Sequence, residues 1–68
     1  MSSGIVRWYS KKKGYGFIIP AEGGKNIFVH RSGIKIDGEA LLNKGQKVEY
    51  DIRENKKGLI AINVILAK

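Results

Sequence analysis

The sequence predicts an all-β fold, in which five short strands form one antiparallel barrel within a single domain over residues 1–68. Two observations predict this class. Five runs of five to eight residues alternate from one face to the other with the period of two that a β-strand has. Turn-forming glycine, asparagine and proline residues separate the runs, and no stretch of ten residues has the period of an amphipathic helix.

The N-terminal half holds three predicted strands, at residues 5–9, 15–19 and 26–30. Strict alternation in the first strand places Val6 and Trp8 on the same face, unless a β-bulge turns Trp8 to the other face. Pro20 ends the second strand. Residues 21–25 include two adjacent glycines and are typical of a hairpin connection between the second and third strands.

The C-terminal half holds two predicted strands, at residues 47–53 and 59–66. Alternation in the fourth strand directs three apolar side chains inward, namely Val48, Tyr50 and Ile52. Alternation in the fifth strand places four apolar side chains on one side, namely Ile60, Ile62, Val64 and Leu66. Between the third and fourth strands, Ser32 is expected to cap one helical turn, and Ile34 or Ile36 to fill the core.

Strand edges decide how strands this short are arranged. A flat sheet exposes unpaired backbone groups at both edges, whereas closure into a barrel pairs them. A chain of 68 residues buries roughly 60% of the surface that its unfolded form exposes, so its apolar core must supply its stability. We therefore expect a five-stranded barrel of the OB-fold type, the oligonucleotide-binding barrel.

Composition excludes several kinds of site. The chain has no cysteine, and its single histidine, His30, cannot form a zinc site alone, so we expect no disulfide, metal or cofactor. No nucleophile, acid and base stand together, so we expect no enzyme. Residues 1–4 contain no apolar signal-peptide core, and no stretch approaches the ~20 apolar residues of a membrane span. We therefore expect a cytoplasmic protein without a membrane partner.

Positive charge and aromatic area coincide in the first half of the chain. Residues 1–36 carry seven Lys or Arg and one acidic residue, which gives +6, whereas residues 37–68 carry six and five, which gives +1. Five of the six aromatic residues also lie in the first half. A polyanion with flat apolar groups is the natural partner for such a surface, and single-stranded nucleic acid fits this description.

Two runs of residues place these aromatic side chains on one face. In residues 13–18, Tyr15 and Phe17 share a face and Ile18 takes the other. In residues 26–30, Phe28 and His30 share a face, opposite Ile27 and Val29. One face of each strand is therefore free to form the core, while the other is aromatic and bordered by lysines, which is the chemistry of a surface that stacks bases.

Three motifs together resemble the bacterial cold-shock proteins. Gly4-Ile5-Val6-Arg7-Trp8-Tyr9 is similar to the opening strand of that family, and residues 13–18 and 26–30 are similar to its two ribonucleoprotein motifs. Residues 45–48 and 61–64 also fit its last two strands, so the likeness covers nearly the whole chain. The resemblance implies a single cold-shock domain that binds single-stranded RNA and DNA as an RNA chaperone, and in some members as an antiterminator, in a stress response.

The resemblance also implies which side chains contact nucleic acid. The matching positions for base stacking are Trp8, Tyr15, Phe17, Phe28 and His30, and those for the phosphate backbone are Arg7 and Lys13. Tyr9 is a further candidate at the edge. No obligate protein partner is implied, and a monomer is expected.

Several residues depart from the family pattern. Arg31 stands where members usually have an aromatic residue, and a guanidinium can stack on a base and pair with a phosphate. Glu39 stands where many members have a further aromatic residue, so fewer stacking positions are expected. Leu59 and Ile60 make the last strand more apolar, and Ile19 falls on the aromatic face by its parity.

Two other binding folds remain as alternatives. Residues 13–17 fit the consensus of an RNA-recognition motif, but that fold needs two helices and none is visible. An aromatic groove on a small barrel can also take a proline-rich peptide, although such grooves usually have acidic flanks and these are basic.

Overall fold

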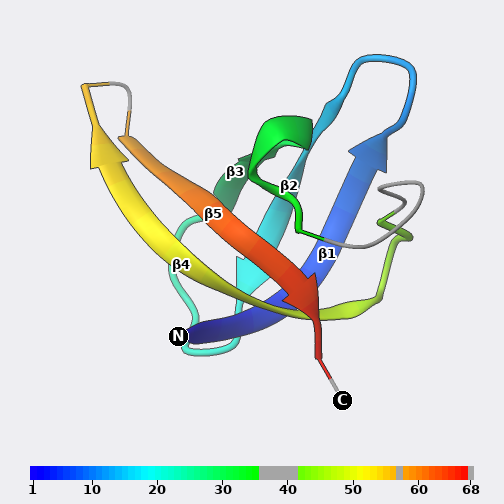
Figure 1. Cartoon of the computed structure of the whole chain (residues 1–68). Helices are drawn as coiled ribbons and strands as arrows, with labels where there is room; N and C mark the ends of the chain where they lie inside the picture. Colours follow the sequence, from blue (N-terminus) through cyan, green and yellow to red (C-terminus); the bar gives the residue numbers. More distant parts are fainter. Residues whose placement is uncertain (36–41, 57, 68) are drawn as a thin grey trace.

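The structure is a computed structural model that describes residues 1–35, 42–56 and 58–67. Its elements, in chain order, are the strands and one 3₁₀ turn β1 (Ser2–Ser10), β2 (Tyr15–Pro20), β3 (Ile27–His30), η1 (Arg31–Gly33), β4 (Lys47–Asn55) and β5 (Gly58–Leu66). The strands close into a barrel in the order β1-β2-β3-β5-β4, and β4 and β5 cross in front of the β1–β2–β3 layer (Figure 1). The predicted class, an all-β barrel of five strands, is confirmed.

One neighbouring pair in the barrel is parallel. Four pairs are antiparallel, namely β1 with β2, β1 with β4, β2 with β3, and β4 with β5. β3 and β5 are parallel, with Phe28 opposite Ile60 and Val29 opposite Ala61. An odd number of strands cannot alternate in direction all the way round a closed ring. The expectation of an antiparallel barrel therefore holds for every pair except the one that closes it.

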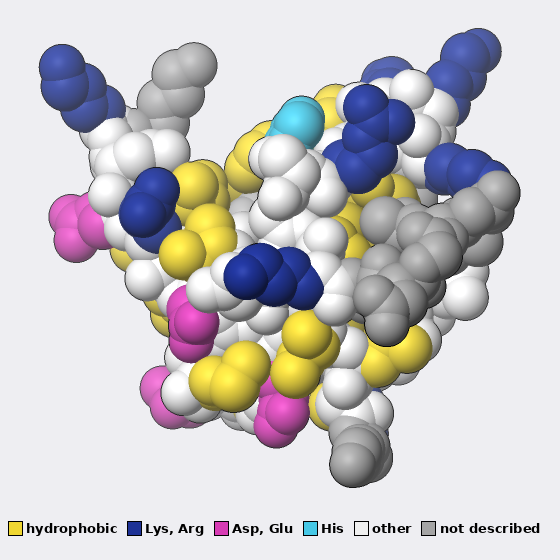
Figure 2. All heavy atoms as spheres, viewed as in Figure 1, with side chains coloured by type: hydrophobic (Ala, Val, Ile, Leu, Met, Phe, Trp, Pro, Cys, Tyr) yellow, Lys and Arg dark blue, Asp and Glu magenta, His cyan; other side chains and the backbone are white. Residues whose placement is uncertain are grey.

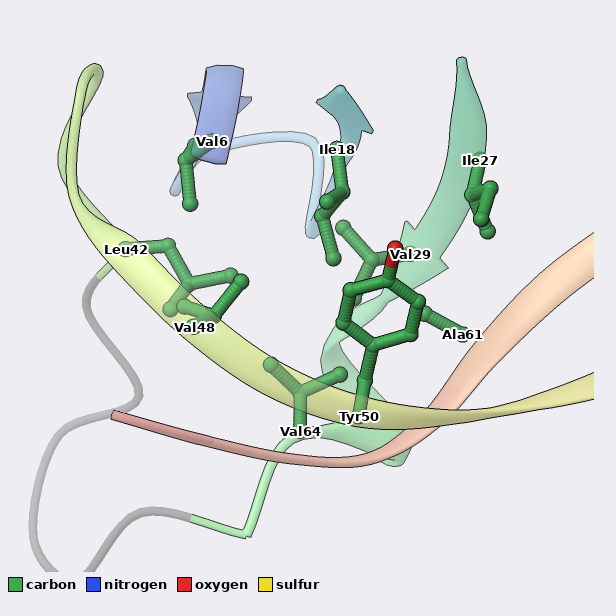
Figure 3. Packing of buried hydrophobic residues seen from close by; sticks show 9 residues of the cluster. All are labelled: Val6, Ile18, Ile27, Val29, Leu42, Val48, Tyr50, Ala61 and Val64. Atoms are coloured by element: carbon green, nitrogen blue, oxygen red, sulfur yellow. The ribbon is translucent and has the colours of Figure 1, made fainter. Parts of the chain in front are cut away.

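The barrel interior holds a single cluster of apolar side chains. Its members, seen in Figure 3, are Val6, Ile18, Ile27, Val29, Leu42, Val48, Tyr50, Ala61 and Val64. Ile34 packs against this cluster, as predicted, and Ile36 lies outside the described residues. Leu42 is buried as well, and strand alternation could not predict this because it lies before β4 and outside any strand.

The prediction that Ile60, Ile62, Val64 and Leu66 share one side of β5 is wrong in part, because Val64 is buried but Leu66 is 42% exposed. Ala61 and Val64 are the buried residues of this strand, three positions apart, and Ile60 and Ile62 are only half-buried. The register with β4 shifts between Glu49 and Asp51, and Asn63 has a φ of 54°. An extra residue in one strand of a pair inverts the alternation beyond it. Asn63 Nδ2 donates to Asp51 Oδ2 at 3.0 Å and so fixes this bulge.

The predicted inward position of Ile52 also fails. Val48 and Tyr50 are fully buried, but Ile52 is 43% exposed. β1 pairs with β4 only as far as Ser2 with Tyr50, so β1 does not cover Ile52. The only helix among the described residues, η1, is a single turn and far too short to span a membrane.

Tyr50 carries the one polar side-chain atom of this core cluster. Its hydroxyl donates to the Ser3 carbonyl oxygen at 3.4 Å, across the β1–β4 pair. Burial raises the pKa of the Tyr50 phenol above its ordinary value, and the negative charge of Glu22 adds to this effect. The folded state therefore favours the neutral phenol.

We predict an alkaline loss of stability through Tyr50. Because the phenol has a higher pKa in the folded state, its contribution to stability is complete below the pKa of an unfolded tyrosine, about 10. That contribution is lost as the pH rises through the pKa of the folded state. Tyr50→Phe should change the free energy of unfolding at pH 7 by no more than about 1 kcal/mol, since the hydrogen bond is long. Urea unfolding at a series of pH values should show a shallower alkaline decline for this variant, and equal slopes would contradict the assignment.

Candidate nucleic-acid interface

A β-bulge in β1 sets which side chains face outward. The register of β1 on β2 runs from Val6 opposite Ile18 to Trp8 opposite Phe17, so Arg7 is the extra residue. Val6 is 1% exposed and belongs to the core, whereas Trp8 is 37% exposed. The alternative in which a bulge turns Trp8 to the other face is thus what occurs. Tyr9 is half-buried against the core, so it is not part of the outer face.

Four aromatic rings meet on this outer face. The ring centroid of Trp8 lies 5.6 Å from that of Tyr15 and 5.5 Å from that of Phe17. The centroid of Phe28 lies 5.6 Å from that of Tyr15 and 5.8 Å from that of Phe17. Each ring therefore contacts two others, at the spacing of favourable aromatic pairs, and we call these four residues the ring cluster.

Strand register explains how the ring cluster forms. In the β2–β3 pair, Tyr15 lies opposite His30 and Phe17 opposite Phe28, so these side chains share one face. Their sequence neighbours Ile18, Ile27 and Val29 point into the core. The predicted division of the two strands into an aromatic face and a core face is confirmed.

His30 extends the outer face beyond the rings. It is exposed, and its Nδ1 accepts a hydrogen bond from the Ser32 backbone N–H at 3.1 Å and lies 2.9 Å from the Ser32 hydroxyl. His30 is thus the cap of η1, and the prediction that Ser32 is the cap is wrong. These bonds fix the orientation of the imidazole at the border of the ring cluster.

Three cationic residues adjoin this face in the chain. Arg7, Lys13 and Arg31 are exposed, and the Arg31 backbone N–H donates to the Gly14 carbonyl oxygen at 2.8 Å. This bond ties η1 to the turn that carries three lysines, Lys11, Lys12 and Lys13. In Figure 2, Lys and Arg side chains are most numerous on the upper right, near the histidine, while Asp and Glu lie on the left and below.

The predicted site residues thus fall into two groups. The ring cluster is in mutual contact, and His30 pairs with Tyr15 at its border. Arg7, Lys13 and Arg31 are exposed and adjoin Trp8, Gly14 and His30 in the chain. Glu39 lies outside the described residues.

A comparison with protein families decides the relationship. The family described as the 'Cold-shock' DNA-binding domain matches residues 2–67. The chain belongs to the cold-shock domain family. It is 48% identical over 61 residues to the "Cold shock-like protein CspC" of Escherichia coli strain K12, covering 90% of this chain and 88% of that relative. It is 45% identical over 64 residues to the "Cold shock-like protein CspA" of Stigmatella aurantiaca, covering 94% of each.

A solved structure supports the fold alone. The structure titled "drosophila Unr CSD456" matches with a TM-score of 0.82 and 18% sequence identity. The match covers 98% of this chain and 26% of that one, so this cold-shock domain corresponds to about a quarter of the fly chain.

Two adjoining hollows continue the outer face of this cold-shock domain past Phe17 and Phe28. They measure about 430 and 420 Å³ and share four lining residues, Phe17, Phe28, Gly58 and Leu59. Ile60 lines one of them because its parallel pairing places it directly beside Phe28. Lys25 and Asn26 line the other. The apolar character of Leu59 and Ile60 is visible in the sequence, but their position beside the rings is not, because it depends on the parallel pair.

Gly16 allows β1 and β2 to approach closely under the ring cluster. A Cβ atom at this position would lie 2.3 Å from the Trp8 carbonyl oxygen and 2.7 Å from Tyr9 Cα, both backbone atoms that cannot move independently. Gly16→Ala should therefore force β1 away from β2 and displace Trp8.

We expect Gly16→Ala to lower the free energy of unfolding by about 1–3 kcal/mol, the usual range for overpacking. Thermal unfolding checks the stability, and the emission maximum of Trp8 checks its surroundings. Gly24→Ala serves as a comparison, because a Cβ atom there meets nothing within 4 Å and any loss reflects only its φ of 100°. A stable Gly16→Ala variant with unchanged Trp8 emission would contradict the close-approach argument.

Proposed function

We propose that this cold-shock domain binds single-stranded RNA and DNA on its outer face, as a cytoplasmic monomer without catalytic activity. Bases stack on Trp8, Tyr15, Phe17, Phe28 and His30, and phosphates pair with Arg7, Lys13 and Arg31. The observation that carries the proposal is the ring cluster, four aromatic side chains in contact with one another yet accessible beside exposed cations.

Stacking on protein rings requires unpaired bases. In a duplex both faces of each base are covered by neighbouring bases, whereas in a single strand the bases can turn out and lie on aromatic side chains. Every base has a π-face, so this contact tolerates sequence, and only a modest preference for pyrimidines is expected. The phosphate contacts are independent of sequence and depend on salt.

The same chemistry supports an RNA chaperone that needs no ATP. A protein that binds only the open strand shifts the melting equilibrium of a hairpin by mass action. Each stack on an aromatic side chain contributes about 1–3 kcal/mol, whereas a duplex step contributes on average about 1.4 kcal/mol. The domain can therefore open a short stem but not a long one. Transcription antitermination would follow if the stem is part of a terminator.

Titration of Trp8 fluorescence tests the proposal directly. A labelled single-stranded oligo-dT or RNA should quench Trp8, and a stable RNA hairpin of the same composition should quench it much less. Measurement at two salt concentrations separates stacking from phosphate contacts. Quenching by a proline-rich peptide, without quenching by the single strand, would reject the proposal in favour of a peptide-binding barrel.

Removal of one ring should weaken binding while the barrel stays folded. Phe17→Ala and Phe28→Ala should each reduce the binding free energy by about 1–3 kcal/mol, because each removes a stacking surface from the outer face. The control is Ile52→Ala, which removes an exposed apolar side chain of β4 that is not part of the ring cluster. Thermal unfolding must accompany the titration. If loss of binding merely follows loss of folding, then these rings are structural.

The three lysines after β1 should set the dependence on salt. Replacement of Lys11, Lys12 and Lys13 by Gln should flatten the plot of log affinity against log salt, by about 0.7 for each phosphate that the protein no longer neutralises. Lys56→Gln is the control, because it removes an exposed positive charge from the β4–β5 hairpin. An unchanged slope in the triple variant would exclude these lysines from the interface.

A further inference from the structure

Two exposed isoleucines lie side by side next to the ring cluster. Ile5 of β1 and Ile19 of β2 are paired in register and are 41% and 39% exposed. Ile19 follows Phe17 by two residues, so both side chains lie on the outer face of β2. The outer face therefore continues as an apolar surface past the rings toward the N-terminal part of β1.

This pair forms one side of a hollow that begins at Trp8. The hollow has a volume of about 430 Å³ and is lined by Ile5, Val6, Arg7, Trp8, Ile19, Lys44 and Gly45. Its described lining residues include two cations, Arg7 and Lys44, and no acidic residue. An apolar surface beside two positive charges is complementary to a nucleotide, which has a flat apolar base and an anionic phosphate.

Backbone hydrogen bonds hold Lys44 at this place. The Gly45 N–H donates to the Val6 carbonyl oxygen at 2.8 Å, and the Val6 N–H donates to the Gln46 carbonyl oxygen at 2.9 Å. The turn at residues 43–46 is thereby fixed to β1 at the residue next to the bulge. Gly45 has a φ of 87°, a conformation that other residues rarely adopt, so the turn geometry is set by the sequence.

We propose that this hollow binds the nucleotide next to the one on Trp8, so that the bound strand continues past the ring cluster. Its base or sugar lies on Ile5 and Ile19, and its phosphate lies between Arg7 and Lys44. The proposal rests on the proposed function, because it extends the same strand. It commits to a nucleotide rather than a protein segment because the hollow is continuous with Trp8 and carries only positive charge among its described lining residues.

A length series of oligonucleotides tests this proposal. Affinity is measured by Trp8 quenching for oligo-dT of about 4 to about 10 nucleotides, within the site sizes known for OB folds. The variants are Ile19→Glu, which replaces the apolar surface by a negative charge, and Lys44→Gln. Ile19→Val and Lys56→Gln are the matched controls, and thermal unfolding is measured for all.

Only the longer oligonucleotides should distinguish the variants. We expect Ile19→Glu and Lys44→Gln to bind the shortest strands like the unmodified chain but to lose about fivefold in affinity for the longest, because each removes an apolar or a phosphate contact to one further nucleotide. Ile19→Val and Lys56→Gln should follow the unmodified chain at every length.

Three results would overturn the proposal. If both variants bind every length like the unmodified chain, the hollow takes no nucleotide. If they lose the same factor at every length, the effect is long-range charge rather than an added contact. If Ile19→Glu instead abolishes a self-association seen by sedimentation, with the length profile intact, a second copy of the chain occupies the surface. Failure of the unmodified chain to bind any strand would reject the proposed function itself.

Discussion

The bulge at Arg7 is the constraint on which the outer face depends. Without the extra residue, Val6 and Trp8 would point the same way, and either the core would lose Val6 or the surface would lose its tryptophan. With it, a single strand supplies a buried valine and an exposed ring two residues apart. Gly16 is the matching requirement on β2, because only a residue without a Cβ fits under the displaced backbone of β1.

The division between core and surface follows from this arrangement. The inner side chains of the strands, with Leu42, complete the core, so the four rings are not needed to close the barrel. They pack on one another instead, in edge and stacked contacts, and Trp8 is exposed while the other three are half-buried. On the face shown in Figure 2, Lys and Arg side chains are most numerous at the upper right, near the histidine, and the acidic side chains lie on the left and below. Charge and aromatic surface are therefore combined on one part of the molecule.

The features that depend on local alternation can be predicted from the amino-acid sequence. The strands, the closed barrel, and the outward faces of Tyr15, Phe17 and Phe28 all follow from a period of two within short segments. The wrong predictions occur where pairing with a neighbouring strand determines which side chains are buried. The bulge at Asn63 places Ala61 instead of Ile62 in the core. The β1–β4 pairing ends at Tyr50, so β1 does not cover Ile52.

Two further features needed the three-dimensional arrangement. His30 rather than Ser32 caps η1, because the imidazole nitrogen reaches the Ser32 N–H. The hollows beside Phe28 and Trp8 depend on residues that are far apart in the chain, Ile60 in one case and Lys44 in the other. The parallel pair, in contrast, was available from counting alone, since five strands in a ring cannot alternate throughout.

That parallel pair also has the fewest paired residues of any strand pair in the barrel. β3 and β5 are matched at two positions only, and about thirty residues of chain separate them, so their closure has the largest loop-entropy cost of any strand pair except β1–β4. Phe28 of β3 and Ile60 of β5 are paired with each other and line the same hollow. A ligand in that hollow would contact both β3 and β5. Its binding would therefore oppose separation of these two strands, the pair with the fewest matched positions in the barrel.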